Sequence, residues 1–177
     1  MDFFDTVAQR YSHKEEFAPT PVPINLLKKI AKAGLDAPNG RNSQAVRLII
    51  LPDEASMATI RTITPALNTA PAAIAVFTDC AITPSGSKVL DIEDYSAAVT
   101  QMLLAATALG YSALWLDSPF WSDEAQKNAC QILAVPQKYH LWAVIPIGLP
   151  KGDTKRREKL PFEDRVSYGK FGMREFS

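Results

Sequence analysis

The sequence predicts one domain of mixed α and β structure, built as three layers with helices covering a sheet. Segments with strand and helix character alternate along the 177 residues. The run 72–78 is apolar at nearly every position, which indicates a strand buried on both faces of the sheet. The run 92–109 is apolar around nearly its whole circumference. Because such a helix must be buried on every side, we expect a second subunit to cover part of it.

Local signals place the elements of the N-terminal half. Asn25 is a suitable N-cap for the second helix, and Pro38 cannot continue that helix. Asp53 and Glu54 complement the dipole at the start of a third helix. In order, we expect a short amphipathic helix over 2–11, an extended proline-rich connector over 19–23, a helix from 25 to 37, a strand over 46–51, a helix from 53 to about 63 and the strand over 72–78.

The C-terminal half continues the alternation. A loop is expected over 79–90, and acidic residues then begin the long helix 92–109, which Gly110 is suited to end. Ser122 is a suitable cap for one more helix. The remaining elements are expected as a strand over 112–116, a helix over 122–133, a strand over 141–147 and a basic, then aromatic tail from 151.

Composition and charge narrow the functional class. The formal net charge is zero at pH 7, so the global charge favours neither nucleic acid nor a membrane surface as a partner. Cys80 and Cys130 lie far apart and are expected to be buried thiols rather than a disulfide or a metal site. No apolar run reaches the roughly 18 residues of a membrane span, and the N-terminus lacks the pattern of a secretory signal. We expect a cytoplasmic protein.

The sequence lacks the usual catalytic and nucleotide-binding motifs. It contains no metal-binding pattern of His or Cys, no GxGxxG and no P-loop. The two histidines, His13 and His140, belong to no recognisable metal or nucleophile motif, and His140 is expected to be structural. We therefore expect no metal, and infer that a bound organic cofactor carries the chemistry.

The first candidate ligand segment follows the N-terminal helix. Arg10, Ser12 and Lys14 alternate along it, so in an extended chain their side chains point the same way. Two cations with a hydroxyl between them can clamp a phosphate or a carboxylate. The alternative is a basic face in solvent.

The second candidate is the turn 38–44 before the first strand. Asn39, Asn42 and Gln44 offer hydrogen-bond donors and acceptors, and Gly40 permits a positive φ and a close approach of the backbone to a ligand. Such a turn suits a planar ligand rich in heteroatoms, and with the basic segment it points to a flavin. The alternative is an ordinary turn whose side chains bond their own backbone. A third candidate, the basic run 155–161, has a solvated loop as its alternative.

These segments together resemble the nitroreductase family of FMN-dependent, NAD(P)H-using oxidoreductases, over nearly the whole chain. The motifs that carry the resemblance are, in order, Arg10-Tyr11-Ser12-His13-Lys14, Ala37-Pro38-Asn39-Gly40-Arg41-Asn42-Ser43-Gln44-Ala45-Val46, Leu109-Gly110 followed by Trp115, Ile147-Gly148-Leu149-Pro150 and Lys159-Leu160-Pro161-Phe162-Glu163. The sequence departs from the family pattern at Tyr11, Asn39, Ala45-Val46 and Lys159, and the loop after Trp115 has no glycine.

The resemblance implies a fold and an assembly. It implies a nitroreductase-like α+β sandwich of three layers, with a central, mainly antiparallel sheet flanked by helices, in an intertwined homodimer. Residues 1–177 would form a single FMN-binding domain, whose C-terminal extension 151–177 packs on the partner subunit.

The resemblance also implies an activity: electrons pass from NADH or NADPH through N5 of FMN to a small acceptor, such as a nitroaromatic or a quinone, by a ping-pong mechanism. Alternatives are a specialised flavin-dependent reductive enzyme and a non-enzymatic FMN-binding or redox-sensing dimer. Phe120, Trp121 and the loop 79–90 are candidates for the wall of the acceptor pocket, although aromatic residues near strand ends more often belong to the core.

The residues expected at the flavin follow from the resemblance. Arg10, Tyr11 and Ser12 would hold the phosphate and the ribityl chain, and Lys14 would reach the N1 and C2 carbonyl side of the ring, where it stabilises the reduced flavin. Arg157 and Lys159 would close on the phosphate. The turn residues Pro38, Asn39, Gly40, Asn42 and Gln44 would meet the flavin from the other subunit. Asp117 and Ser118 would lie at N5, where Pro119 cannot donate a backbone hydrogen bond.

Overall fold

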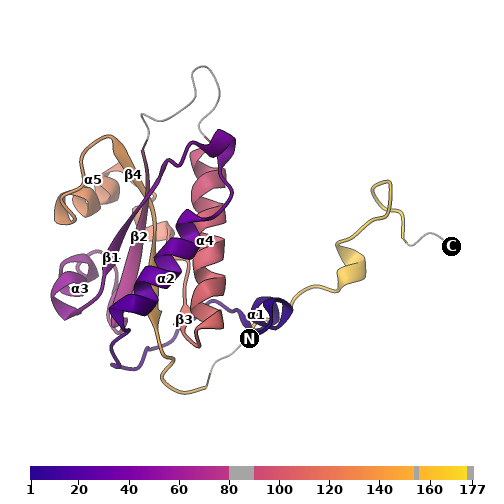
Figure 1. The fold of residues 1–177 in the computed structure, drawn as a ribbon, viewed down its shortest axis with the longest axis horizontal. Helices are drawn as coiled ribbons and strands as arrows, with labels where there is room; N and C mark the ends of the chain where they lie inside the picture. Colours follow the sequence, from indigo (N-terminus) through magenta and orange to yellow (C-terminus); the bar gives the residue numbers. More distant parts are fainter. Residues whose placement is uncertain (80–89, 154–155, 175–177) are drawn as a thin grey trace.

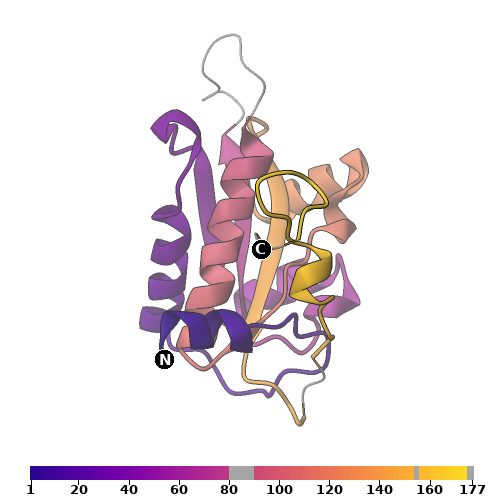
Figure 2. The ribbon, with the colours of Figure 1, turned by 90° about the vertical axis from the view of Figure 1, so that its right-hand side faces the viewer.

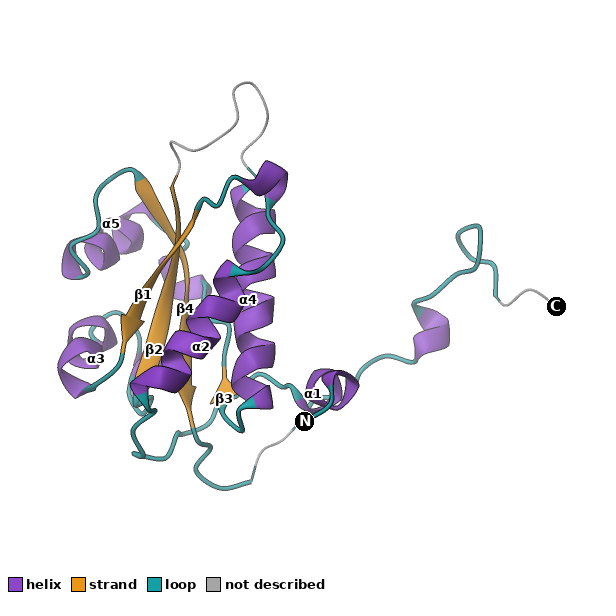
Figure 3. Cartoon of the chain, viewed as in Figure 1, coloured by secondary structure: helices purple, strands orange, loops and turns teal. Residues whose placement is uncertain are grey.

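The computed structural model describes residues 1–79, 90–153 and 156–174. Its centre is a four-stranded sheet in the order β1-β2-β4-β3, in which every neighbouring pair is antiparallel (Figures 1 and 3). The strands are β1 (Val46–Leu51), β2 (Ala72–Asp79), β3 (Ser112–Ala113) and β4 (Tyr139–Gly148). The expected α+β fold with a mainly antiparallel sheet is confirmed. None of the helices in the described part of the chain is long and apolar enough to cross a bilayer.

Helices cover both faces of the sheet, which makes the three expected layers. One face packs against α2 (Ile24–Leu35) and α4 (Asp91–Ala108), and the other against α3 (Glu54–Arg61) and α5 (Asp123–Ile132) (Figure 3). The strand β2 is buried at every position, as its apolar sequence predicts. A further short helix, α1 (Phe3–Gln9), lies across the C-terminal end of α4 (Figures 1 and 2).

Most of the predicted helix signals lie where expected. Asp53 caps α3 by accepting from the Ser56 backbone, and Ser122 caps α5 by accepting from Ala125. Gly110 follows α4 with φ of 82°. The prediction for Asn25 is wrong, because α2 begins at Ile24 and its capping position is Pro23, which makes no side-chain cap.

The strand expected over 112–116 is shorter than predicted because of a proline in its neighbour. Pro146 of β4 accepts a hydrogen bond from the Leu114 backbone at 3.4 Å, but it has no N–H to return one. The regular ladder therefore ends at Ala113, and only an isolated bridge between Leu116 and Val144 continues it. The chain therefore turns away from the sheet only beyond the Leu116 bridge.

Gln126 of α5 fastens that helix to β4. Its side-chain oxygen accepts from the Leu141 N–H at 3.1 Å, and its amide nitrogen donates to the Leu141 carbonyl and, at 3.2 Å, to the Phe120 carbonyl. The same nitrogen lies 3.2 Å from Nε2 of His140, whose ring packs on Trp142. These contacts agree with a structural role for His140.

Replacing Gln126 with Ala should lower the free energy of unfolding by about 2–3 kcal/mol, because it removes two side-chain hydrogen bonds to the buried Leu141 peptide groups. Urea unfolding followed by circular dichroism measures this change. Lys127→Ala, an exposed neighbour on the same helix, is the control and should change stability by less than about 0.5 kcal/mol. Equal effects of the two substitutions would contradict the assignment.

Candidate functional site

The N-terminal basic segment runs along the outer edge of β3. Ser12 forms a parallel bridge with Ala113, and the His13 N–H donates to the Ala113 carbonyl at 3.1 Å. The hydroxyls of Tyr11 and Ser112 lie 2.6 Å apart. His13 is buried, whereas Ser12 and Lys14 on either side of it are exposed. The extended backbone therefore fixes the segment while it leaves Ser12 and Lys14 available to a ligand.

The cations of this segment have no carboxylate partner within the described chain. Arg10 and Lys14 enter none of the ion pairs found there. The nearby Glu16 is taken by Lys151 at 2.7 Å, a pairing that lowers the pKa of Glu16. Unpaired positive charge of this kind suits a phosphate.

The C-terminal segment adds a residue that was not among the predicted ligands. Arg156 lies over the Tyr11 ring, 5.6 Å from its centroid, and donates to the Ala8 carbonyl at 3.2 Å. The expected Arg157 and Lys159 are exposed, and among the described residues neither is joined to the N-terminal segment by a hydrogen bond, an ion pair or a ring contact. Arg156 belongs to the basic run 155–161, but the sequence alone does not show which cation of that run contacts the N-terminal segment. Lys155 lies outside the described residues.

The turn before β1 is held by one buried carboxylate of α4. Asp94 is 4% exposed and accepts from the Gly40 N–H at 2.6 Å and from the Ser43 hydroxyl at 3.1 Å. Within the turn, Asn39 accepts from the Gln44 N–H at 3.0 Å and donates to the Ala37 carbonyl. The Asn39 side chain thus bonds its own backbone, which is the alternative that the sequence left open for this turn.

Gly40 does not use the positive φ that glycine permits. The left-handed residues are Arg41, Asn42 and Gln44, with φ between 51° and 54°. Gly40 is needed instead for a close approach, because a Cβ there would lie 2.2 Å from Cδ1 of Leu90. Of the turn residues expected at the flavin, Pro38, Asn42 and Gln44 are exposed and Asn39 and Gly40 are half-buried.

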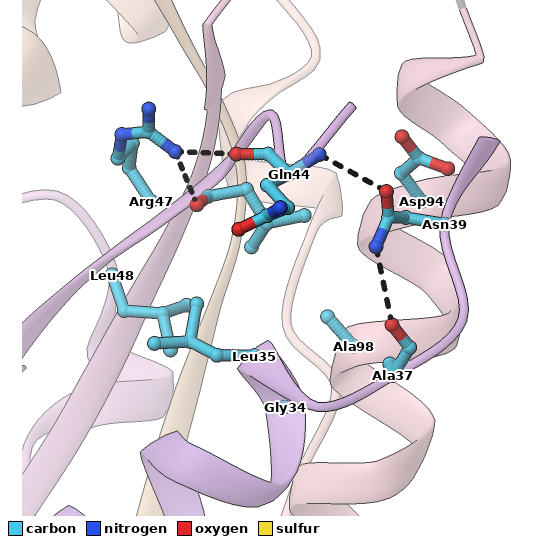
Figure 4. A pocket seen from close by; sticks show the side chains of 10 residues that line it. Gly34, Leu35, Ala37, Asn39, Gln44, Arg47, Leu48, Asp94 and Ala98 are labelled. Carbon is cyan, nitrogen blue, oxygen red and sulfur yellow. Dashed lines mark hydrogen bonds between the residues drawn. The ribbon is translucent and has the colours of Figure 1, made fainter. Parts of the chain in front are cut away.

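A pocket of about 370 Å³ lies behind the turn, between α2, β1 and α4 (Figure 4). Its polar rim is mutually bonded: the Arg47 guanidinium donates to the Gln44 and Val46 carbonyls, and Asp94 is occupied by the turn. The apolar floor is formed by Gly34, Leu35, Ala37, Val46, Leu48 and Ala98. We interpret this pocket as part of the structure that supports the turn.

The basic segment and the turn lie at opposite ends of α4 (Figure 1). The turn contacts Asp94 in the first turn of α4, and Ser12 contacts Ala113 just beyond the end of α4. An 18-residue helix is about 27 Å long. A ligand held by one copy of the basic segment is therefore remote from the turn of the same chain.

A third part of the site follows β3 along the same edge of the sheet. Leu116 is held by two hydrogen bonds with Val144, of 3.2 and 2.8 Å. The amides of Asp117 and Ser118, which come next, donate to no acceptor within the described chain. The indole Nε1 of Trp115 is also buried there without a partner among the described residues. Unused donors gather where the flavin ring is expected.

The residues considered for the acceptor pocket divide into two groups. Phe120 is 2% exposed and belongs to the core beneath α5, so its proposed place in the pocket wall is wrong. Trp121, its neighbour, is 77% exposed. Of the loop 79–90, positions 80–89 lie outside the described residues, as does Cys80.

Burial shifts the pKa values of two titratable groups, Asp91 and His140. Burial raises the pKa of Asp91, against the lowering effect of its hydrogen bond with Thr78. Burial lowers the pKa of His140, against the opposite effects of Asp91 and Asp123. In the part of the chain that the structure describes, no three acidic, His or Cys side chains gather in a way that could bind a metal.

Known proteins of one family are similar to this chain in sequence and in fold. The model of the nitroreductase family matches residues 7–64 and 60–149. A protein of Archaeoglobus fulgidus, provisionally named NADH dehydrogenase/NAD(P)H nitroreductase, is 32% identical over 133 residues, which cover 72% of this chain and 74% of that protein. A provisionally named nitroreductase of Desulfovibrio desulfuricans, solved in complex with FMN, is 27% identical, with a TM-score of 0.75 over 97% of this chain and 98% of that one.

The fold is shared with a wider set of solved structures. An FMN-dependent nitroreductase of Clostridium difficile R20291 is 24% identical, with a TM-score of 0.80 over 95% of this chain and 99% of that one. Because the family model and the Archaeoglobus relative both cover most of the chain, the protein belongs to the nitroreductase family of oxidoreductases.

Proposed function

We propose that this protein is an FMN-dependent oxidoreductase that takes electrons from NADH or NADPH and passes them to a small acceptor, such as a nitroaromatic or a quinone, by a ping-pong mechanism. The observation that carries the proposal is the set of unpaired cations and unused backbone donors along one edge of the sheet. The names of the Archaeoglobus and Desulfovibrio relatives support the donor and the cofactor.

The donor set fits FMN. Arg10, Ser12 and Arg156 would bind the phosphate and the ribityl chain, because guanidinium groups and hydroxyls match phosphate oxygens. Arg157 and Lys159 follow Arg156 on the same exposed segment and would add to the positive field. When bound, FMN supplies the two-electron chemistry between the nicotinamide and the acceptor.

The protein's own residues would position and stabilise rather than transfer protons. Lys14 would place a positive charge beside the N1 and C2 carbonyl side of the ring, where negative charge develops on reduction. The unused amides of Asp117 and Ser118 would supply the donor at N5 in place of Pro119. No side chain needs to act as a general base, which accounts for a sequence without a conventional catalytic set.

The complete site would require two chains. The turn 38–44 cannot reach the basic segment of its own chain, so the proposal places it at the FMN bound mainly by the partner. Apolar side chains are exposed on α1, at Phe3, Phe4 and Val7, and on the C-terminal arm that extends from the body in Figure 1, at Leu160, Phe162 and Phe171. Such surfaces mark protein contacts. We propose an intertwined homodimer in which residues 151–177 pack on the partner, located in the cytoplasm where NAD(P)H is available.

The absorbance spectrum of the purified protein tests the proposal first. Flavin bands are expected, and they should bleach when NADH or NADPH is added without oxygen, then return when a nitroaromatic or a quinone is supplied. Comparison of the two nicotinamides identifies the preferred donor. Flavin bands that neither donor bleaches would favour a carrier or sensor of FMN instead. No bands after FMN is supplied would contradict the cofactor assignment.

A further inference from the structure

Trp121 is an exposed indole on a rigid piece of backbone. Its side chain is 77% exposed, although tryptophan usually buries most of its ring. It ends the short 3-10 helix η3 (Ser118–Phe120), and its N–H donates to the Ser118 carbonyl at 3.4 Å. The position of its backbone is therefore set, while its ring faces solvent.

Anchors on both sides of Trp121 keep this backbone in place. Phe120 before it is buried in the core, and the Phe120 carbonyl accepts from Gln126 at 3.2 Å. Ser122 after it caps α5 through the Ala125 N–H at 3.2 Å. The Trp121 backbone cannot move without breaking the start of α5, so the position of this residue at the surface is a property of the fold.

The surroundings of Trp121 suit a small ligand better than a protein partner. The residues that follow it, Ser122, Asp123 and Glu124, are exposed and polar, whereas the centre of a protein interface joins several apolar or aromatic side chains. On the other side, the same short helix begins with the unused amides of Asp117 and Ser118. Trp121 is therefore within a few residues of the Asp117 and Ser118 amides, which are proposed to contact N5 of the flavin.

We propose that Trp121 is a specificity-determining residue, which stacks against planar aromatic electron acceptors at the edge of the flavin site. The inference rests on the proposed function and names a residue that would select aromatic acceptors at that site. An electron-rich indole face attracts an electron-poor ring, such as a nitroaromatic or a quinone, beyond the contribution of buried area. A non-aromatic acceptor gains nothing from this contact.

The ratio of two kcat/KM values tests the proposal. With NADH as donor, kcat/KM is measured for a nitroaromatic and for ferricyanide, a non-aromatic acceptor. The ratio should fall about tenfold in Trp121→Ala, in line with the strength of an aromatic stacking contact, and Trp121→Phe should restore most of it. Lys127→Ala, an exposed change on α5, is the control and should keep the wild-type ratio. An unchanged ratio in Trp121→Ala overturns the proposal and leaves the oxidoreductase function intact.

A binding measurement separates this inference from the proposed function. Calorimetric titration of the oxidised protein with 4-nitrobenzoate, in the absence of any nicotinamide, should give a Kd that rises about tenfold in Trp121→Ala and recovers in Trp121→Phe. This result would hold even if no donor reduced the protein, in which case the oxidoreductase function alone fails. An equal Kd in wild type and Trp121→Ala, or a change of oligomeric state in Trp121→Ala, overturns the aromatic site.

Discussion

Protein that carries Arg10→Glu is expected to purify without flavin. Arg10 is half-buried and has no carboxylate partner in the described chain, so its charge is available to a phosphate. The substitution removes a charge-assisted hydrogen bond and adds a negative charge beside a dianion. The affinity for FMN should fall by at least about a hundredfold. Titration with FMN, followed by quenching of its fluorescence, measures the change against Lys29→Glu, an exposed lysine of α2.

Mixed dimers extend this experiment, because they show whether each FMN site is formed by one chain or by two. Asn42→Asp places a negative charge on the turn and keeps its left-handed conformation, since Asp tolerates the φ of 54° found there. Arg10→Glu and Asn42→Asp chains with different affinity tags are expressed together, and mixed dimers are isolated by both tags. Each parent dimer should lack FMN, whereas the mixed dimer should bind about one FMN per two chains.

The number of FMN molecules bound by the mixed dimer distinguishes a site shared between two chains from a site within one chain. If each site takes its basic segment from one chain and its turn from the other, one site of the mixed dimer has both defects and the other has neither. If each site belonged to one chain, both sites would have one defect and the mixed dimer would hold no FMN. Flavin retained by the Asn42→Asp parent would show that the turn does not contact FMN.

The sequence predicted the layers and most elements because their signals are local. The apolar run of β2 and the caps Asp53 and Ser122 depend on residues within a few positions of one another. The prediction for Asn25 is wrong although its signal is also local: α2 begins at Ile24, directly after Pro23, so Asn25 lies inside the helix. The short β3 depends on Pro146, more than thirty positions later, which no local pattern reveals.

The candidate site was predictable in its parts and not in its assembly. The alternation of Arg10, Ser12 and Lys14 is a local property of the sequence, so this segment could be predicted. The support of the turn by Asp94 joins residues 54 positions apart, and the contact of Arg156 with Tyr11 joins the two ends of the chain. Gly40 illustrates the same limit, because its function is to leave room for Leu90 rather than to take a positive φ. Such roles follow from tertiary packing.

Removal of the Asp94 carboxylate is the change that should damage the molecule most, because one buried group holds the whole turn in place. Asp94→Ala leaves the Gly40 N–H and the Ser43 hydroxyl without their acceptor in a poorly hydrated site. Loss of hydrogen bonds to a buried charge should lower the free energy of unfolding by about 2–4 kcal/mol, as measured by urea unfolding. The flavin content should fall with it, since the turn would no longer be held against α4.

Asp36→Ala is the matched control for Asp94→Ala, because Asp36 also belongs to a helix end but is exposed and forms a surface ion pair with Lys32. An exposed pair of this kind contributes less than about 1 kcal/mol, so the control should retain stability and flavin. Asp94→Asn, which keeps one acceptor oxygen but not the charge, should lie between the two. If Asp94→Ala is no less stable than Asp36→Ala, the turn is held by its internal Asn39 bonds instead, and the support assigned to α4 is wrong.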